Sequence, residues 1–135
     1  MASRDKNDLH LIIGIAYQKA VLEYLTKYPN DPKPFITCTH RSNEEQNQLY
    51  NQKPKVTNAK AGESPHNYLP SLAFDIAFIT VSKQLDWSNY LFKKFAEILI
   101  KIEPRMEWGG NWAGFKDAPH YQLKSWKSYL EHQLA

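Results

Sequence analysis

This chain of 135 residues has one cysteine, Cys38, so no disulfide can form within it. It must therefore rely on a hydrophobic core, and a chain of this length can bury roughly two thirds of its surface. We expect one domain over residues 1–135. Cys38 lies in the apolar run P-F-I-T-C-T, where we expect a small buried side chain rather than a nucleophile.

The sequence also lacks an apolar run long enough to cross a membrane, because the longest one near the N-terminus covers only Leu11 to Ala16. The first ten residues, M-A-S-R-D-K-N-D-L-H, carry mixed charge and have no apolar centre, unlike a signal peptide. We therefore expect a protein made soluble in the cytoplasm, without membrane insertion. If its substrate lies outside the cell, something other than a leader must deliver the protein.

Neither sign of charge dominates, since 17 basic and 14 acidic residues give a net charge of +3. This mild excess favours anionic partners such as cell-wall polymers, but it is too small and too scattered to indicate nucleic-acid binding. Repeats, low-complexity tracts and linkers are absent as well. Nothing in the sequence therefore divides the chain into further modules.

Helices and short strands are predicted to alternate irregularly along the chain. The expected helices cover residues 8–28, 42–52 and 87–102, and the expected strands cover residues 34–39, 72–79, 106–108 and 120–123. Apolar residues recur at helical spacing on one face of the first helix: Leu11, Ile15, Leu22 and Leu25. We expect this face to form one wall of the core. The order of elements indicates an α+β fold, with a small antiparallel sheet flanked by helices.

An aspartate interrupts the apolar strand expected over residues 72–79. Because side chains alternate along a strand, the bulky residues at 72, 74, 76 and 78 share one face and Asp75 lies on the other, between two alanines. A carboxylate is unfavourable there unless something compensates its charge. By the same alternation, the strand over residues 120–123 can deliver His120 to the same side of the sheet.

Two histidines and this aspartate form a candidate zinc site. Binding through His66, Asp75 and His120 would leave the fourth position to water, as in catalytic zinc sites. Asp117 stands three residues before His120, so its carboxylate can lie beside that water without binding the metal. The sequence has no H-E-x-x-H pattern that would compete. Taken singly, the three residues also have ordinary explanations: a loop histidine, a salt-bridged carboxylate and a satisfied strand-edge histidine.

The order and spacing of several motifs give the combination more weight. S-P-H followed by A-F-D, and later W-G-G-N-W with D-A-P-H, closely resembles the zinc peptidases of the D-alanyl-D-alanine carboxypeptidase and L-alanyl-D-glutamate endopeptidase family. These have a hedgehog-like fold and include many small phage endolysins. H-R-S-N-E-E-Q-N-Q-L-Y also resembles the Arg-containing run before that family's first ligand, so the resemblance spans Thr39 to Gln122.

The resemblance implies one zinc ion per chain, bound by His66, Asp75 and His120. It assigns Asp117 as the general base and acid, and Arg41 as the cation that steadies the carbonyl oxygen while it becomes an oxyanion. One departure is that L-P-S replaces a lone glycine between the first histidine and the aspartate, which are nine residues apart here. The strand phase of A-F-D is kept, so we expect a bulged turn and intact ligands.

Several residues near these motifs have competing interpretations. Arg41 could instead form a surface ion pair with the glutamate at position 44 or 45. Glu107 is a rival base, although strand alternation and the lack of D-x-x-H spacing favour a structural role for it. The tryptophans at 108 and 112 are expected to pack in the core, with the wall of a substrate groove as the alternative.

The implied function is hydrolysis of peptide stems in peptidoglycan by a phage-type endolysin that cuts between L-Ala and D-Glu. The expected protein is a monomer that reaches the wall after release and does not bind nucleic acid. One alternative is a D-alanyl-D-alanine carboxypeptidase on the same scaffold, which would need a fixed cation or hydroxyl for the free C-terminus of its substrate. Another is a zinc-containing module that binds wall polymer or protein without catalysis.

Overall fold

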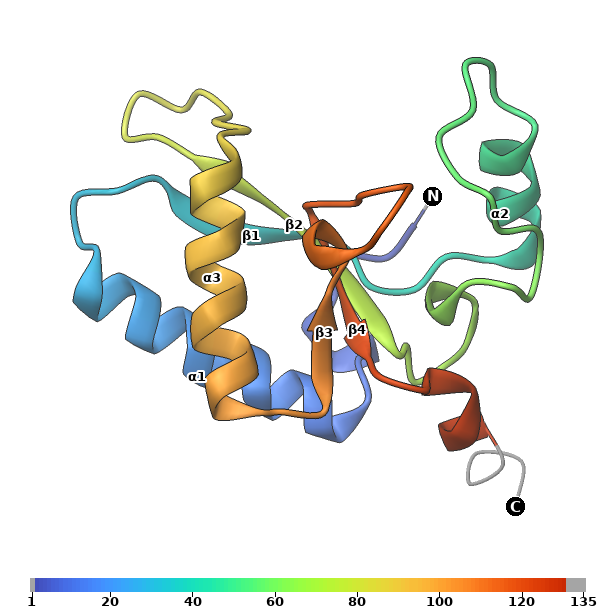
Figure 1. Ribbon diagram of the computed structural model, residues 1–135, viewed down its shortest axis with the longest axis horizontal. Coiled ribbons are helices and arrows are strands. Elements are labelled where there is room, and N and C mark those ends of the chain that lie inside the picture. The colour runs from blue at the N-terminus through green and yellow to red at the C-terminus, as the bar shows by residue number, and fades with distance from the viewer. Residues whose placement is uncertain (1, 131–135) are drawn as a thin grey trace.

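The structure is a computed structural model that describes residues 2–130. Its helices are α1 (Leu11–Lys27), α2 (Asn43–Tyr50) and α3 (Asn89–Ile102), and its strands are β1 (Lys33–Cys38), β2 (Ala73–Ile79), β3 (Met106–Trp108) and β4 (His120–Leu123). The strands form an antiparallel sheet in the order β1–β2–β4–β3. Helices α1 and α3 lie on one side of it and α2 on the other (Figure 1). The predicted α+β fold is therefore confirmed.

The predicted elements agree closely with the observed ones wherever local signals are strong. Strands β3 and β4 begin and end at the expected residues. Helix α2 begins with the expected capping box, in which Ser42 Oγ accepts from the Glu45 amide at 3.1 Å and Glu45 Oε1 accepts from the Ser42 amide at 2.9 Å. These reciprocal bonds satisfy two backbone donors that a helix start leaves open.

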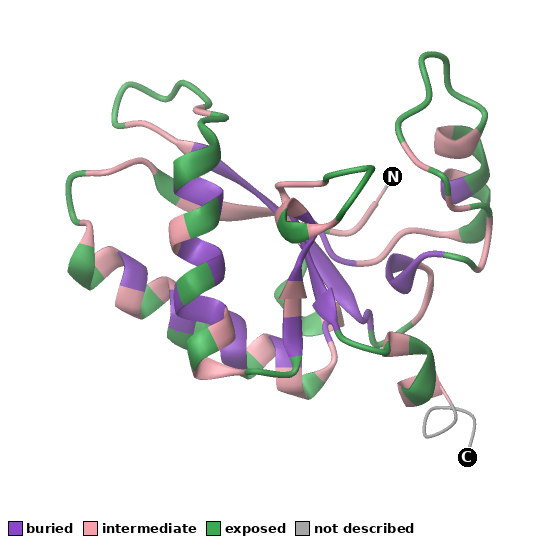
Figure 2. Ribbon diagram, viewed as in Figure 1, coloured by how far each residue is buried: buried purple, intermediate pink, exposed green. Residues whose placement is uncertain are grey.

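The core lies between β2 and the two long helices, where buried residues gather (Figure 2). The bulky residues predicted to share one face of the strand are fully buried: Leu72, Phe74, Ile76 and Phe78. Phe74 stacks on Tyr121 of β4 at 5.2 Å between ring centroids. The alternation expected in this strand is therefore confirmed, and it turns Asp75 away from the core.

The face of α1 that packs against the core differs from the predicted one. Leu11, Ile15 and Leu22 are 73, 46 and 68% exposed, and of the predicted face only Leu25 is partly buried against the core. The residues buried instead share the other helical face: Ile13, Ala16, Tyr17, Ala20 and Tyr24. This second set also recurs at helical spacing, so periodicity alone does not choose between the two faces.

Tyrosine can serve in this core because its polar end finds a partner. Tyr24 Oη donates to the Pro32 carbonyl at 2.9 Å, and its ring lies 5.7 Å from that of Phe78. A buried hydroxyl without a partner would cost about 1–3 kcal/mol. The hydrogen bond removes this cost, so Tyr24 can occupy the core on a face that the aliphatic pattern of the sequence did not indicate.

A charged residue of α3 sits among the tyrosines at the edge of this core. Lys94 pairs with the Asp31 carboxylate, and its Nζ lies 3.9 Å from the ring centroid of Tyr28 and 5.1 Å from that of Tyr90. The lysine side chain is 19% exposed. Partial burial strengthens both the ion pair and the cation–π contacts relative to fully solvated ones.

We expect Lys94→Met to lower the free energy of unfolding by about 1–2 kcal/mol, because it removes the charge while keeping an apolar stem. Urea denaturation followed by circular dichroism measures this change. The matched control is Lys93→Met, since Lys93 is exposed on the same helix. Equal unfolding midpoints for the two variants would contradict the prediction.

None of the helices within residues 2–130 has the length and hydrophobicity that a bilayer crossing requires.

Candidate metal centre

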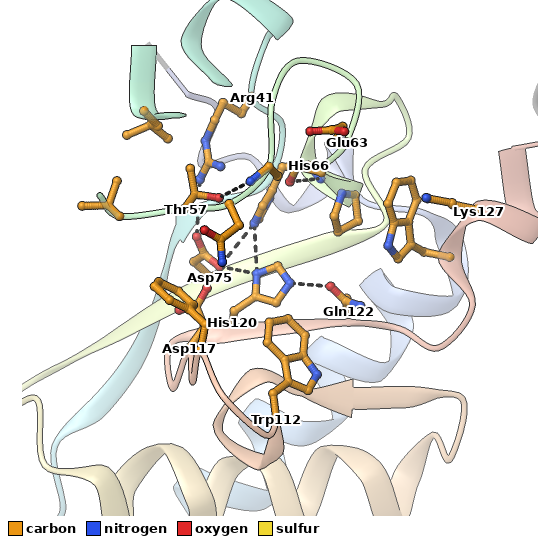
Figure 3. A pocket seen from close by; sticks show the side chains of 18 residues that line it. Arg41, Thr57, Glu63, His66, Asp75, Trp112, Asp117, His120, Gln122 and Lys127 are labelled. Atoms are coloured by element: carbon orange, nitrogen blue, oxygen red, sulfur yellow. Dashed lines mark hydrogen bonds and ion pairs between the residues drawn. The ribbon is translucent and has the colours of Figure 1, made fainter. Parts of the chain in front are cut away.

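An open cleft of about 740 Å³ is lined by residues of α2 and its following loop on one side and by residues of the turns before and after β4 on the other (Figure 3). All five candidate site residues line it: Arg41, His66, Asp75, Asp117 and His120. Figure 3 shows the two histidines and Asp75 directed toward one another. The structure thus brings together residues that are as far apart in sequence as His66 and His120.

Each member of the central group is placed by a different element. Asp75 lies on β2 and His120 begins β4, and the two are direct partners in the register of these strands. His66 lies in a short 3-10 turn, Pro65–Asn67, whose start is capped by Ser64 Oγ accepting from the His66 amide at 3.2 Å. Two neighbouring strands and one capped turn therefore point three side chains at a common position.

The three facing atoms form a nearly equilateral triangle. His66 Nε2 lies 3.2 Å from Asp75 Oδ1 and 3.3 Å from His120 Nδ1, and His120 Nδ1 lies 3.0 Å from Asp75 Oδ1. Ligands about 2.0–2.1 Å from a tetrahedral zinc ion are separated from one another by about 3.3 Å. The triangle is close to that spacing, and nitrogen and carboxylate oxygen are donors that zinc accepts, so the residues fit the metal.

Hydrogen bonds on the far side of each ring direct the histidine lone pairs into this triangle. His66 Nδ1 donates to the Thr39 carbonyl at 2.8 Å, which makes Nε2 the unprotonated nitrogen whenever the ring is neutral. His120 Nε2 donates to Gln122 Oε1 at 2.7 Å, which leaves Nδ1 unprotonated. Such outer partners fix the tautomer and the orientation of metal-binding histidines.

The electrostatics of the cluster also favour a cation at its centre. Burial opposes a positive charge on His66, but the charge and hydrogen bond of Asp75, together with Cys38, outweigh burial and raise the pKa of His66 to about 10. Burial would raise the pKa of Asp75, yet the charge of His66 and hydrogen bonds from both histidines hold it well below its usual range. A proton and a metal ion therefore compete for the same place.

Cys38 also has its sulfur near this cluster. Donor atoms of Cys38, His66 and Asp75 lie within 4.8 Å of one another. However, Cys38 Sγ approaches His66 from the Nδ1 side, at 3.7 Å, whereas Asp75 faces Nε2. One ion cannot contact both nitrogens of a single ring in this way, so His120 completes the triangle better than Cys38. The thiol is buried, as expected.

The turn at residues 69–71, where the spacing departs from that of the family, helps to fix the carbonyl that orients His66. Ser71, fully buried, places its Oγ 2.6 Å from the same Thr39 carbonyl that accepts from His66. The Ser71 backbone also pairs with Asp8 and His10 at 2.7 and 2.9 Å. The longer turn thus ties the N-terminal segment to the carbonyl that orients the histidine.

Asp117 reaches the cleft from the loop before β4, and this loop packs closely against Gly109. The Asp117 amide donates to the Gly109 carbonyl at 3.0 Å, and a Cβ at Gly109 would lie 2.3 Å from the Asp117 carbonyl oxygen. Trp108 Nε1 donates to the Ala118 carbonyl at 2.6 Å. Only glycine allows this approach. Burial raises the pKa of the Asp117 carboxyl, although nearby positive groups, His120 first, oppose the rise.

Arg41 is held over the cluster rather than extended into solvent. Its Nη1 donates to Gln46 Oε1 at 2.9 Å and its Nη2 lies 3.7 Å from Asp75 Oδ2. Only 15% of the Arg41 side chain is exposed. Gln46 is fully buried and also donates to the Ala59 carbonyl at 2.8 Å. A surface ion pair with a neighbouring glutamate therefore does not account for the position of the guanidinium.

Sequence reasoning missed the residues that support the cluster, namely Thr39, Gln46, Ser71 and Gln122. Thr39 acts through its backbone carbonyl, which leaves no signal in the residue type. Gln122 falls on the same strand face as His120, and this alternation was the available clue. Trp108 is buried, as expected, and Trp112 lines the cleft with its ring 5.4 Å from that of His120, as the groove alternative supposed.

An α+β scaffold that points two imidazoles and a carboxylate into an open cleft has the donor set that is typical of metalloproteins with a catalytic site. A sequence profile of the D-alanyl-D-alanine carboxypeptidase family matches residues 57–123. The chain belongs to this family of metallopeptidases.

Individual relatives point the same way. The chain is 37% identical over 100 residues to the peptidoglycan L-alanyl-D-glutamate endopeptidase CwlK of Bacillus subtilis (strain 168), covering 65% of this chain and 59% of that protein. It is 32% identical over 80 residues to the L-alanyl-D-glutamate peptidase of Listeria phage A118, covering 58% of this chain and 28% of that protein. The matches thus span less than two thirds of either relative.

The fold has a solved counterpart. The crystal structure of the Serratia marcescens L-Ala D-Glu endopeptidase ChiX superimposes with a TM-score of 0.69 at 19% identity, covering 98% of this chain and 92% of that one. At this identity the likeness concerns the fold alone.

Proposed function

We propose that this protein is a zinc-dependent endopeptidase that cleaves peptidoglycan stems between L-alanine and D-glutamate. The observation that carries the proposal is the triangle of His66 Nε2, Asp75 Oδ1 and His120 Nδ1, with edges of 3.0–3.3 Å, at the wall of an open cleft. The similarity to two proteins named as L-alanyl-D-glutamate peptidases selects the bond. We further propose a monomeric single domain that acts on the wall after release, as a phage-type endolysin does.

In this proposal His66, Asp75 and His120 hold one zinc ion. Zinc, when bound, supplies a Lewis acid and lowers the pKa of water from about 15.7 to about 7. Asp117 takes a proton from the attacking water and returns it to the leaving amine. The raised pKa of its buried carboxyl suits a group that must both accept and release a proton.

Arg41 stabilises the carbonyl oxygen as it gains negative charge. Gln46 occupies one edge of its guanidinium, which limits the directions in which the remaining N–H groups can point. A planar group with a permanent charge and a fixed direction is suited to charge that develops only during the reaction. The aromatic residues Trp112 and Phe115 line the same cleft and offer a wall for the peptide.

Mass spectrometry of purified muropeptides tests the function. After digestion with the zinc-loaded protein, we expect new D-glutamate amino termini and stems that end at L-alanine, and none of these after chelation. Loss of a single terminal D-alanine would instead identify a carboxypeptidase. Binding of wall material without any cleavage would identify a non-catalytic module. Restoring zinc after chelation should restore cleavage.

Arg41→Ala is expected to lower kcat by about 10²–10³ with little change in KM, because an oxyanion forms only on the way to the transition state. Steady-state kinetics on a purified stem peptide measures both constants. Arg105→Ala is the matched control, since Arg105 is exposed and pairs with Glu103. A change confined to KM would assign Arg41 to holding a substrate carboxylate instead.

A further inference from the structure

A chain of hydrogen bonds extends from His120 away from the metal-facing side of the ring. His120 Nε2 lies 2.7 Å from Gln122 Oε1, and Gln122 Nε2 donates to Glu107 Oε1 at 2.8 Å. Glu107 and Gln122 face each other across strands β3 and β4. His120 and Gln122 are only 5 and 8% exposed, so water has little access to the two inner members. Figure 3 shows the first of these bonds on the side of the His120 ring that faces away from Asp75.

The donor and the acceptor in each of these two hydrogen bonds can be assigned by starting from Glu107, the residue farthest from the metal-facing side of His120. An ionised carboxylate accepts hydrogen bonds and donates none, so Glu107 requires the amide NH2 of Gln122 to face it. The Gln122 oxygen then faces His120 and requires a proton on Nε2. A neutral imidazole carries only one such proton, which leaves a lone pair on the His120 Nδ1 that faces Asp75 and His66.

The two histidines differ in how firmly their tautomers are fixed. His66 donates to the backbone carbonyl of Thr39, which can only accept. His120 relies on a side-chain amide, which could present either its oxygen or its NH2 group after a half-turn. If NH2 faced His120, the proton would have to move to Nδ1, into the middle of the cluster. His120 therefore needs a further residue that prevents this half-turn.

We propose that Glu107 is this residue: a positioning residue that acts through Gln122 to keep His120 Nδ1 free to bind a metal. The proposal rests on the proposed metal site, and it deepens it. In this proposal Glu107 positions His120 and does not act as the general base, the alternative role that the sequence left open for it. The proposal also accounts for the pairing of the Glu107 carboxylate with a neutral amide, since no cation among residues 2–130 pairs with it.

The test uses the full-length chain with Glu107→Gln, which has the same shape but can donate as well as accept. Two properties are measured: zinc affinity by chelator competition, and the proton position on His120 by NMR of ¹⁵N-labelled imidazoles in the zinc-free chain. We expect zinc affinity to fall by about 10-fold, the lower end for a lost outer partner. We also expect His120 to populate both tautomers, whereas the parent chain holds its proton on Nε2. Glu97→Gln, on the exposed side of α3, is the matched control and should change neither.

A double variant separates bond direction from packing. Glu107→Gln combined with Gln122→Glu puts the acceptor-only group next to His120 and the amide on the outside, so it should restore both the tautomer and most of the affinity. Failure to restore them, after a loss in the single variant, would overturn the proposal in favour of packing. Unchanged affinity and tautomer in Glu107→Gln would overturn it directly. If the parent chain binds no zinc while the tautomer still responds to Glu107→Gln, the proposed function fails and the positioning role stands.

Discussion

Replacing His66 with alanine is expected to abolish stoichiometric zinc binding and to reduce wall cleavage by on the order of 10⁴ or more, because two remaining ligands hold zinc poorly and the metal supplies much of the rate enhancement. His66 is 2% exposed, so neighbouring side chains or water cannot readily take its place. Metal analysis of the purified variant and turnover of a stem peptide measure the two effects. A variant that keeps about one equivalent of zinc would show that the ligand assignment is wrong.

Cys38→Ala is the matched control for this result. Its sulfur lies 3.7 Å from His66 Nδ1, within the same buried region, yet on the side of the ring that faces away from Asp75. The control should keep its zinc. Chelation should likewise remove activity more completely than it removes the fold, because the core packs between β2, α1 and α3 on the opposite side of the sheet. Near-UV circular dichroism after chelation measures this second difference.

Much of the fold was predictable from the sequence, wherever a local pattern of apolar residues is compatible with only one buried face. The alternation along β2 allows only one arrangement in which four bulky side chains are buried together, and this arrangement turns Asp75 to the cleft. The face of α1 was not predictable in this way, because two of its faces recur at helical spacing. The choice between them depends on the rings that α1 meets, such as Phe74, 5.1 Å from Tyr17. Such long-range contacts are absent from a local pattern.

The site divides in the same manner. The motifs identified the residues that the structure brings together around Asp75, because these residue types carry the chemistry themselves. The residues that hold the histidines in place could not be predicted from the sequence. Thr39 acts through its backbone carbonyl, and the contact between Gln122 and Glu107 depends on the register between β3 and β4. Gly109 is a further example. Only glycine fits at this position, because the Asp117 loop passes so close to its backbone that no Cβ has room. The pairing of β3 with β4 and the close approach of the Asp117 loop to Gly109 are tertiary contacts, and a local sequence pattern does not predict them.

Asp117→Asn gives the sharpest test of the mechanism. The amide keeps the shape of the carboxylate but cannot accept a proton, so the variant should retain about one equivalent of zinc and lose about 10²–10⁴ in rate. Asp117→Ala should behave similarly, because Asp117 is assigned beside the metal rather than on it. Asp86→Asn, at a carboxylate outside the cleft lining, is the control and should be fully active.

The outcomes of this experiment separate three assignments. If Asp117→Ala loses its zinc, Asp117 is a ligand and one of His66, Asp75 and His120 is not. If it keeps both zinc and full activity, another group moves the proton, and Glu107 is then the next carboxylate to test. In the structure, however, Glu107 is directed at the Gln122 amide at 2.8 Å, whereas Asp117 lines the cleft on a loop held against Gly109. A base must reach the reacting water, and this geometry favours Asp117.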